Sequence, residues 1–195
     1  QSMAKHNRGK LLPVWGTEAG ARGLDTLYYD GIDFETMYYP NFVTELDQAE
    51  QMVRQNLIAF GEGMERNATF YLYSGAAGMD CFSFVDGCNG IRPKTLFPAF
   101  ANLVERLSGA EPVRRFEQPE NGSCGYLFRK DGKLFAALWN FDPHHKTHPV
   151  ELPLRPEQLK VFNLVGEPVR PAGRDKCMLE LTGGALYFYP QGITD

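Results

Sequence analysis

Two short apolar segments, each followed by an amphipathic helical pattern, most constrain how the first half of this chain folds. Residues 10–16 and 68–73 are continuously apolar, as strands buried in parallel sheets are. Between them, residues 44–61 open with a Thr-Glu-Leu-Asp capping box, with Asp replacing the usual Glu, and then carry apolar residues at steps of three and four. A second helical stripe spans residues 96–107. The order strand, helix, strand, helix predicts parallel β/α units.

The second helix is predicted to bury one apolar face, which includes Phe97, Phe100, Val104 and Leu107. After Pro112 the pattern changes to short alternating runs separated by turn residues, as in an antiparallel β-sandwich. These runs are residues 125–129, 134–141, 150–152, 159–164, 177–181 and 185–189.

Two glycine-containing dipeptides lie between these runs. Asp131-Gly132 is typical of a two-residue hairpin turn, and Gly183-Gly184 is a candidate for a second one. The composition shift near Pro112 divides the 195 residues into an α/β segment, 10–111, and an all-β segment, 112–195. Residues 1–9 are expected to be a disordered start that begins with Gln-Ser-Met, the remnant of a cleaved tag.

Composition and charge exclude several classes of partner. The formal net charge is -4, so nucleic acid and anionic membranes are poor candidates. No apolar stretch approaches the ~20 residues that span a bilayer. Aromatic residues are abundant, with 14 Phe, 9 Tyr and 2 Trp. This composition favours β structure and sugar-binding surfaces, although aromatic-rich cores are commoner.

Cysteine and histidine spacing gives no strong metal signal. The four cysteines form no C-x-x-C pair, so a structural zinc site is not expected. Cys81 and Cys88 flank one loop and fit either a disulfide across it or free buried thiols. His144, His145 and His148 lie in one polar stretch that is typical of a turn between strands. We therefore predict no metal and no cofactor.

Glu18 is the candidate catalytic residue. It follows the first apolar segment directly, and active sites of parallel α/β folds are built at the carboxyl ends of the strands. Spacing alone also fits a capping or ion-paired carboxylate. Asp86, in the loop after the second apolar segment, fits either a hydrogen bond to a sugar hydroxyl or a solvated loop position.

Aromatic residues surround the candidate site in the sequence. Trp15 precedes Glu18, and the long loop after Gly20 is rich in tyrosine and carboxylates. The candidate sugar-binding aromatics are Trp15, Tyr28, Tyr29, Tyr38 and Tyr39. The alternative is that these rings pack the loop against the protein.

The run Pro-Val-Trp-Gly-Thr-Glu-Ala-Gly, residues 13–20, resembles the seventh strand of the large clan of (β/α)-barrel retaining glycoside hydrolases. Residues 44–63, 68–73 and 90–100 are similar, in that order, to the seventh helix, the eighth strand and the entry to the eighth helix. Val161–Val169 and Leu181–Tyr187 resemble the small β-sandwich that follows many such barrels. The resemblance covers nearly the whole chain.

The resemblance implies that Glu18 is the nucleophile and that carbohydrate, an oligo- or polysaccharide, is the substrate. In this clan the acid/base glutamate usually follows an asparagine after the fourth strand, and no Asn-Glu pair occurs here. An eight-stranded barrel takes ~200–250 residues, whereas about 100 precede Pro112. The chain is therefore expected to hold only the last two β/α units and to be inactive alone.

Three sources of the remaining barrel stay open: a longer parent chain, a second copy or complementary chain covering the open face, or a different packing. The resemblance favours an extracellular or periplasmic location. A non-catalytic carbohydrate-binding or assembly module is an alternative, with Trp139 and residues 144–148 as contacts, although Trp139 lies in an apolar run and is expected to face the core. A further alternative is a pseudo-enzyme remnant that is held in an oligomer.

Overall fold

The computed structural model describes residues 13–20, 44–69, 72, 83–86, 92–118, 122–140 and 147–191. The structure is mainly β, with two α-helices and several small open sheets in this part of the chain. The first elements are β1 (Trp15–Ala19), α2 (Glu45–Gly61), β2 (Arg66–Thr69), β3 (Val85–Asp86), β4 (Arg92–Pro93) and α3 (Leu96–Leu107). Strands β5 (Glu111–Gln118), β6 (Ser123–Lys130), β7 (Lys133–Asn140) and β8 (His148–Leu152) follow. A 3₁₀ turn, η4 (Pro156–Gln158), precedes β9 (Leu159–Phe162), β10 (Pro168–Val169), β11 (Cys177–Leu181) and β12 (Leu186–Pro190).

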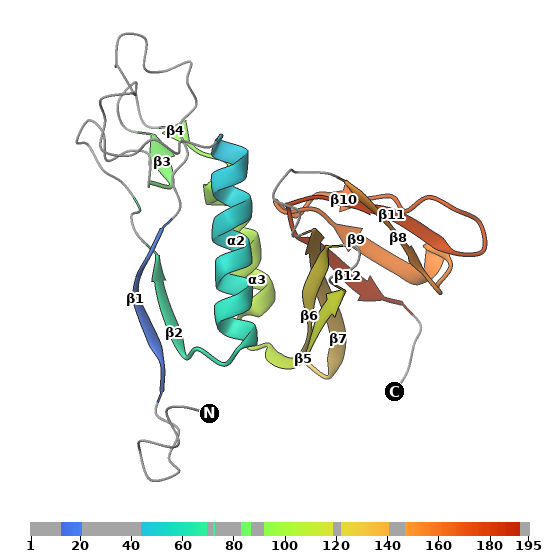
Figure 1. Ribbon diagram of the computed structural model, residues 1–195, viewed down its shortest axis with the longest axis horizontal. Coiled ribbons are helices and arrows are strands. Elements are labelled where there is room, and N and C mark those ends of the chain that lie inside the picture. The colour runs from blue at the N-terminus through green and yellow to red at the C-terminus, as the bar shows by residue number, and fades with distance from the viewer. Residues whose placement is uncertain are drawn as a thin grey trace.

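Strands β1 and β2 form a parallel pair, and helix α2 connects them in sequence (Figure 1). Trp15 lies opposite Arg66, and Gly16 lies opposite Asn67. The α/β pattern predicted for this region is therefore present. The strands do not lie at their predicted positions. Strand β1 begins at Trp15 and includes Glu18, whereas residues 10–16 were predicted. Strand β2 begins at Arg66, whereas residues 68–73 were predicted.

Helix α2 begins where its sequence predicts. The Thr44 side chain accepts from the Asp47 backbone N–H at 3.1 Å, and the Asp47 carboxylate accepts from the Thr44 N–H at 3.1 Å. This reciprocal capping box satisfies backbone donors that a helix start leaves unpaired. The buried stripe of α2 includes Ala49, Met52, Val53 and Leu57, all fully buried.

Helix α3 buries only part of the predicted face. The predicted Phe100 and Leu107 are partly buried against the core, whereas Phe97 is 44% exposed and Val104 is 51% exposed. The most buried side chains of the helix are those of Leu96, Ala99 and Leu103. The helix is apolar on more than one side, so periodicity alone did not decide which side meets the rest of the chain. The sheet described next selects the buried side.

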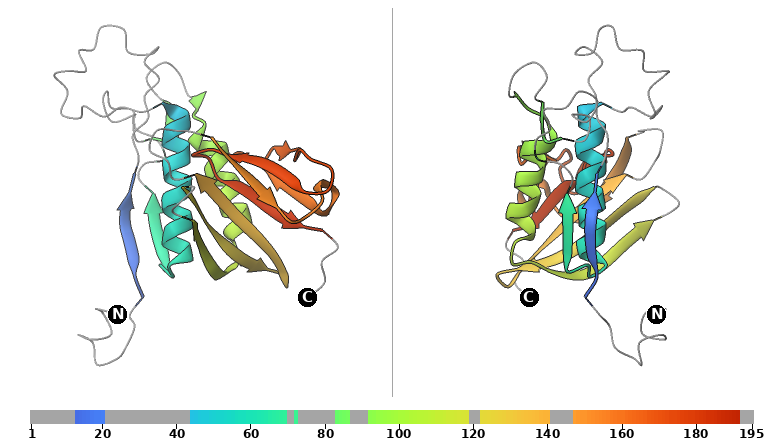
Figure 2. Two further views of the ribbon diagram at one scale, coloured as in Figure 1. Left: turned by 45° about the vertical axis from the view of Figure 1, so that its right-hand side comes forward. Right: turned by 90° about the vertical axis from the view of Figure 1, so that its left-hand side faces the viewer.

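The largest sheet has six antiparallel strands in the order β10-β9-β12-β7-β6-β5. Its β6–β7 turn contains Asp131 and Gly132 at φ 51° and 73°, as the predicted hairpin requires. Helices α2 and α3 cover one face of this sheet, and the two-stranded β8–β11 ribbon covers part of the other (Figure 2). Strands β5 and β10 were not predicted.

The face of the sheet toward the helices is aromatic. Its fully buried side chains belong to Tyr126, Phe128, Phe135, Trp139 and Tyr187. Phe128 stacks on Phe135 with ring centroids 5.2 Å apart. These rings and the buried stripes of α2 and α3 form one hydrophobic cluster. One core thus extends from the helices into the sheet.

Gly183 and Gly184 do not form the predicted hairpin turn. Strand β11 pairs with β8, whereas β12 pairs with β7 and β9, so the two glycines join strands of different sheets. The Arg54 guanidinium of α2 donates to the Gly183 carbonyl at 2.6 Å. A Cβ at Gly183 would lie 2.3 Å from a Glu50 carboxylate oxygen, so the glycine permits close approach of helix α2.

Arg106 joins α3 to the sheet through its guanidinium. The group lies 4.6–5.2 Å from the ring centroids of Phe162, Tyr187 and Tyr189. It also donates to the Tyr189 hydroxyl at 2.7 Å and to the Asn102 amide oxygen at 2.9 Å. Cation–π attraction and charged hydrogen bonds are strongest in such partly desolvated positions.

We expect Arg106→Ala to lower the free energy of unfolding by about 2 kcal/mol, because it removes both sets of contacts. Chemical denaturation monitored by circular dichroism measures the loss. The matched control is Arg114→Ala, since Arg114 is exposed and lies over a single ring, that of Phe116, at 5.4 Å. If Arg114→Ala lowers the free energy of unfolding as much as Arg106→Ala does, the interpretation is contradicted.

Candidate functional site

The backbone places Glu18 near the carboxyl end of β1, where it is the next-to-last residue of the strand. The β3–β4 hairpin lies at this same end of the parallel pair, near the start of α2 (Figure 1). Asp86 ends β3, so the chain brings the positions of Glu18 and Asp86 to one end of the β1–β2 pair. Tyr28, Tyr29, Tyr38 and Tyr39 lie outside the described residues.

The β3–β4 hairpin is anchored on both helices. The Arg92 guanidinium pairs with both carboxylate oxygens of Glu45, in the first turn of α2. The Phe84 carbonyl accepts from the Lys94 backbone N–H at 2.9 Å. The Phe84 ring packs edge-on against Phe100 of α3, with centroids 5.1 Å apart. These contacts fix Asp86 relative to the start of α2.

Trp15 lies at the other end of β1 from Glu18. The two residues are three positions apart along the extended strand, roughly 10 Å. The indole is 55% exposed and donates its N–H to the Glu65 carboxylate at 2.9 Å. The Arg66 guanidinium lies over the indole ring, 4.6 Å from its centroid. Sequence reasoning did not anticipate these partners, because Glu65 and Arg66 are 50 residues or more away along the chain.

The two faces of the β1–β2 pair differ. Gly16 and Asn67 face α2: the Asn67 amide donates to Asn56 of α2 at 2.9 Å, and a Cβ at Gly16 would lie 2.3 Å from the Asn67 side chain. The neighbouring side chains alternate to the opposite face, as in any strand. Those of Trp15, Thr17, Arg66 and Ala68 are exposed there. They line a shallow groove with Gly16 and Asn67.

A polar anchor connects the six-stranded sheet to this pair of strands. The Glu62 carboxylate, just after α2, accepts from the Tyr126 hydroxyl at 2.7 Å and from the Arg115 guanidinium at 3.0 Å. In the same turn, the Glu65 backbone N–H donates to the Val14 carbonyl at 3.0 Å, and Val14 directly precedes β1. The sheet therefore holds the turn from which β2 begins.

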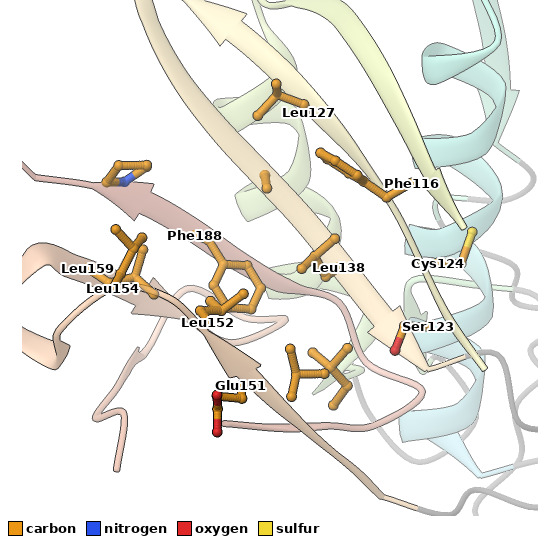
Figure 3. Close-up of a pocket in the computed structure, with 14 residues that line it drawn as sticks. Phe116, Ser123, Cys124, Leu127, Leu138, Glu151, Leu152, Leu154, Leu159 and Phe188 are labelled. Atoms are coloured by element: carbon orange, nitrogen blue, oxygen red, sulfur yellow. The ribbon is translucent and has the colours of Figure 1, made fainter. Parts of the chain in front are cut away.

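A second hollow lies on the far face of the sheet, between β5–β6–β7 and the β8–β11 ribbon (Figure 3). It has a volume of about 320 Å³ and an apolar lining. Its polar side chains are few, chiefly Ser123 and Glu151. Such a lining does not offer the array of hydrogen-bonding groups that a sugar requires.

The remaining residues singled out in the sequence are only partly described. Trp139 is fully buried in the helix–sheet core, as predicted from its apolar run. Cys124 and Cys177 are free, buried thiols whose pKa values are raised by burial. Cys81, Cys88, His144 and His145 lie outside the described residues, and His148 begins β8.

Two general features of the described residues bear on function. They contain no group of three His, Cys, Asp or Glu side chains placed to hold a metal ion. Neither helix of this part of the chain is long and apolar enough to cross a membrane.

Solved structures of glycoside hydrolases match this fold. A family 39 glycoside hydrolase from the gut symbiont Bacteroides cellulosilyticus superposes with a TM-score of 0.67 over 95% of this chain, at 17% sequence identity. A glycoside hydrolase family 30 subfamily 8 xylanase from Clostridium acetobutylicum gives 0.58 over 98%, at 12% identity. This chain has the fold of part of a (β/α)-barrel glycoside hydrolase.

The predicted resemblance is thus confirmed at the level of the fold. A family 30 endoxylanase from Clostridium papyrosolvens also matches, with a TM-score of 0.55 and 11% identity. The chain spans only 35% to 45% of the length of these three glycoside hydrolases. No family model and no curated protein matches the sequence.

Tyrosine ionisation gives a test of the anchor between the six-stranded sheet and the β1–β2 pair. Burial and the Glu62 carboxylate raise the pKa of Tyr126 well above its usual value of 10.0, and burial raises that of Tyr187. Because the folded state holds these protons more tightly, their contribution to stability is complete below pH 10 and is lost as pH rises further. We therefore expect the free energy of unfolding to fall between pH 10 and pH 12.

Replacing both tyrosines, in Tyr126→Phe with Tyr187→Phe, is expected to flatten this alkaline fall, as measured by urea denaturation at a series of pH values. At neutral pH the Tyr126→Phe change alone costs about 1 kcal/mol, because it removes the bond to Glu62. Tyr187→Phe costs little there, since the Tyr187 hydroxyl has no hydrogen-bond partner among the described residues. An unchanged alkaline slope in the double variant argues against this account.

Proposed function

We propose that this chain is the C-terminal portion of a retaining glycoside hydrolase, with Glu18 as its nucleophile. The observation that carries the proposal is the position of Glu18 at the carboxyl end of a parallel β/α strand, in a fold shared with glycoside hydrolases. In this proposal β1–α2 and β2–α3 are the last two units of a barrel, within residues 10–111. Residues 112–195 then form the appended β-sandwich.

Retaining hydrolysis proceeds in two steps. The Glu18 carboxylate attacks the anomeric carbon while a second carboxyl group protonates the departing glycosidic oxygen, and a covalent glycosyl ester forms. Water, deprotonated by that second group, then attacks the same carbon and releases Glu18. The two carboxyl groups must lie ~5–5.5 Å apart. We propose that a β/α unit beyond this chain supplies the second one, so that the 195 residues alone are inactive.

The exposed surfaces support a missing remainder of the barrel. Parallel sheets are normally covered on both faces, yet the face of β1–β2 that carries Trp15, Thr17 and Arg66 is exposed in the described part of the chain. The helices also expose large apolar side chains, with Leu46 of α2 at 53% and Phe97 of α3 at 44%. In a complete barrel, further strands and neighbouring helices cover such positions.

The substrate in this proposal is an oligo- or polysaccharide with O-glycosidic bonds. Two of the matching structures are xylanases, which makes a xylan-type polymer a reasonable first substrate to assay. Trp15, Tyr28, Tyr29, Tyr38, Tyr39 and Asp86 remain the proposed sugar contacts. An extracellular or periplasmic location is proposed with them, since polysaccharides are found there.

A non-catalytic carbohydrate-binding module receives less support. Sugar-binding platforms need exposed aromatic rings, and the largest rings of the six-stranded sheet, those of Trp139, Tyr126 and Tyr187, are buried toward the helices. Trp139, the sheet residue first considered for this role, is fully buried.

The deciding experiment places Glu18→Gln in the longer polypeptide obtained by extending the reading frame. We expect kcat/KM on aryl xylosides and related aryl glycosides to fall by roughly 10³-fold or more, the scale on which losing a nucleophile acts. Azide restores turnover to Glu18→Ala if the residue is the nucleophile, because the anion occupies the vacated space and attacks the anomeric carbon. Glu105→Gln, on the exposed side of α3, is the matched control and keeps full activity. Undiminished turnover of Glu18→Gln excludes the assignment.

The exposed barrel face can be tested through tryptophan. In the 195-residue chain we expect iodide to quench Trp15 readily, because its ring is 55% exposed whereas Trp139 is fully buried. Trp15→Phe identifies the quenched signal by removing it. In the longer polypeptide the same ring is expected to be protected.

Light scattering supplies the control for self-association. Protection of Trp15 in the 195-residue chain together with a mass above 22.0 kDa means that a second copy covers this face. Equal quenching of Trp15 in the short and the long polypeptide contradicts the proposed barrel.

A further inference from the structure

Strand β1 carries one more residue than the strand it pairs with, at the place where the proposed nucleophile lies. Gly16 lies opposite Asn67, and the next paired residues are Ala19 and Thr69. Residues 16 to 19 of β1 thus span the same length as residues 67 to 69 of β2. The extra residue between the two pairs makes a β-bulge in β1, at positions 17 and 18.

The paired residues on either side of the bulge belong to the face toward α2. The Asn67 amide donates to Asn56 of α2, which places Asn67 on that face. Thr69, two residues further along β2, shares this face because side chains alternate along a strand, and its hydroxyl oxygen is buried. Residues paired across neighbouring strands lie on the same face of a sheet, so positions 16 and 19 of β1 belong to the α2 face as well.

The bulge decides the face on which position 18 lies. Trp15 and Thr17 are exposed on the face of β1 and β2 away from α2, which we call the open face. In a regular strand the position after Thr17, which Glu18 occupies, would turn back toward α2. Position 19 has that place instead, so positions 17 and 18 both belong to the open face. One extra residue thus changes the face of every position that follows it.

Gly16 and Asn67 fix the point at which the bulge begins. A Cβ at Gly16 would lie 2.3 Å from the Asn67 amide oxygen, so a larger residue cannot stand opposite Asn67 without displacing it. The Asn67 amide is held in turn, since Asn56 accepts from it at 2.9 Å and donates to the Met52 carbonyl at 2.8 Å. Slipping β1 by one residue in either direction would bring a larger side chain against this amide, because a tryptophan and a threonine flank the glycine.

The cost of burying charge also favours the bulged register. Without the extra residue, Glu18 would stand opposite Thr69 and bring a carboxylate to the α2 side of the strand pair. The side chains placed there, those of Asn56, Asn67 and Thr69, carry no charge with which to pair it. Removing a carboxylate from water without a cationic partner is costly. The bulge assigns an alanine to that place instead.

We propose that this bulge, fixed by Gly16 and Asn67, directs the proposed nucleophile Glu18 to the open face of β1 and β2. Asn67 is then a positioning residue, since it faces α2 and acts on Glu18 through the register of β1. The catalytic meaning rests on the proposed function, in which the open face is the interior of the barrel. The assignment of positions to faces does not, because it follows from the pairing of the two strands.

Thiol labelling of cysteine variants reads the face of each position and needs no enzymatic activity. Thr17→Cys, Glu18→Cys and Ala19→Cys are made singly in the 195-residue chain and treated with iodoacetamide. Mass spectrometry follows the tryptic peptide of residues 11–22, which contains no native cysteine. Dividing each rate by that of the same variant unfolded in urea removes differences in the intrinsic reactivity of the thiols.

The bulge predicts the order open, open, buried for these three positions. We expect the normalised rates of Thr17→Cys and Glu18→Cys to agree within about threefold, and that of Ala19→Cys to be roughly tenfold lower or more, because a buried thiol reacts slowly. A regular strand predicts the order open, buried, open. A slow Glu18→Cys, or an Ala19→Cys as fast as Glu18→Cys, overturns the proposal.

A further variant tests the role of Asn67. Asn67→Ala removes the amide that lies against Gly16, so β1 is free to lose its bulge, and we expect the ratio of the Glu18→Cys rate to the Ala19→Cys rate to fall about threefold or more. Asn102→Ala is the matched control, because Asn102 also donates at 2.9 Å but joins α3 to the Leu164 carbonyl rather than to β1. It is expected to leave the ratio unchanged.

Circular dichroism checks that every variant is folded, and Asn67→Ser replaces Asn67→Ala if the latter is not. An unchanged ratio in the Asn67 variant, or an equal fall in Asn102→Ala, overturns the role of Asn67. The labelling and the activity assays fail separately. If Glu18→Gln abolishes turnover but the labelling order is that of a regular strand, the catalytic assignment stands and the bulge proposal is wrong. If the labelling order shows the bulge but Glu18→Gln keeps full turnover, the placement of position 18 stands and the proposed function is wrong.

Discussion

The hydrophobic core shared by the two helices and the aromatic face of the sheet is the constraint on which the rest of the structure depends. Helices α2 and α3 bury Met52, Leu57 and Leu103 against the rings of the six-stranded sheet. A helix and a sheet each have one apolar surface, and neither is stable with that surface in water. The alternation along β7 provides for both layers, since Phe135, Ala137 and Trp139 face the helices while Ala136 and Leu138 face the ribbon. The described elements therefore pack around this shared core, even though the parallel sheet among them has only two strands.

Polar contacts at the edges of this core fix the orientation of the helices, which apolar packing alone does not determine. Asn102 of α3 donates to the Leu164 carbonyl at 2.9 Å, and Arg54 of α2 donates to the Gly183 carbonyl at 2.6 Å. Each contact pairs a backbone carbonyl near the helix–sheet interface, where an unpaired group is costly. The Glu62 anchor extends the same arrangement to the turn before β2. The sheet and the strand pair that carries the proposed nucleophile are therefore connected through this turn.

The sequence predicted what local interactions determine and missed what distant ones decide. The capping box of α2 and the Asp131-Gly132 turn depend on adjacent residues, and both formed as predicted. Gly183 was misinterpreted because its role depends on Arg54, 129 residues away along the chain. The buried face of α3 was only partly predicted for the same reason, since a distant sheet selects it. For the site, the strand pattern predicted the carboxyl-end position of Glu18. No local signal connects Trp15 to Glu65 and Arg66, which lie 50 residues or more away, just before and at the start of β2.

The arrangement of layers also bears on what the sheet contributes to the proposed glycoside hydrolase. A sheet that binds polysaccharide presents aromatic rings to solvent, and this one directs its largest rings at α2 and α3. In a barrel the helices form the outer layer, with one side against the strands and the other toward solvent. Here the side of α2 and α3 away from the β1–β2 pair is covered by the sheet (Figure 2). The sheet therefore supports the helices that lie against β1 and β2, and it leaves the opposite face of these strands open for the further strands of the proposed barrel.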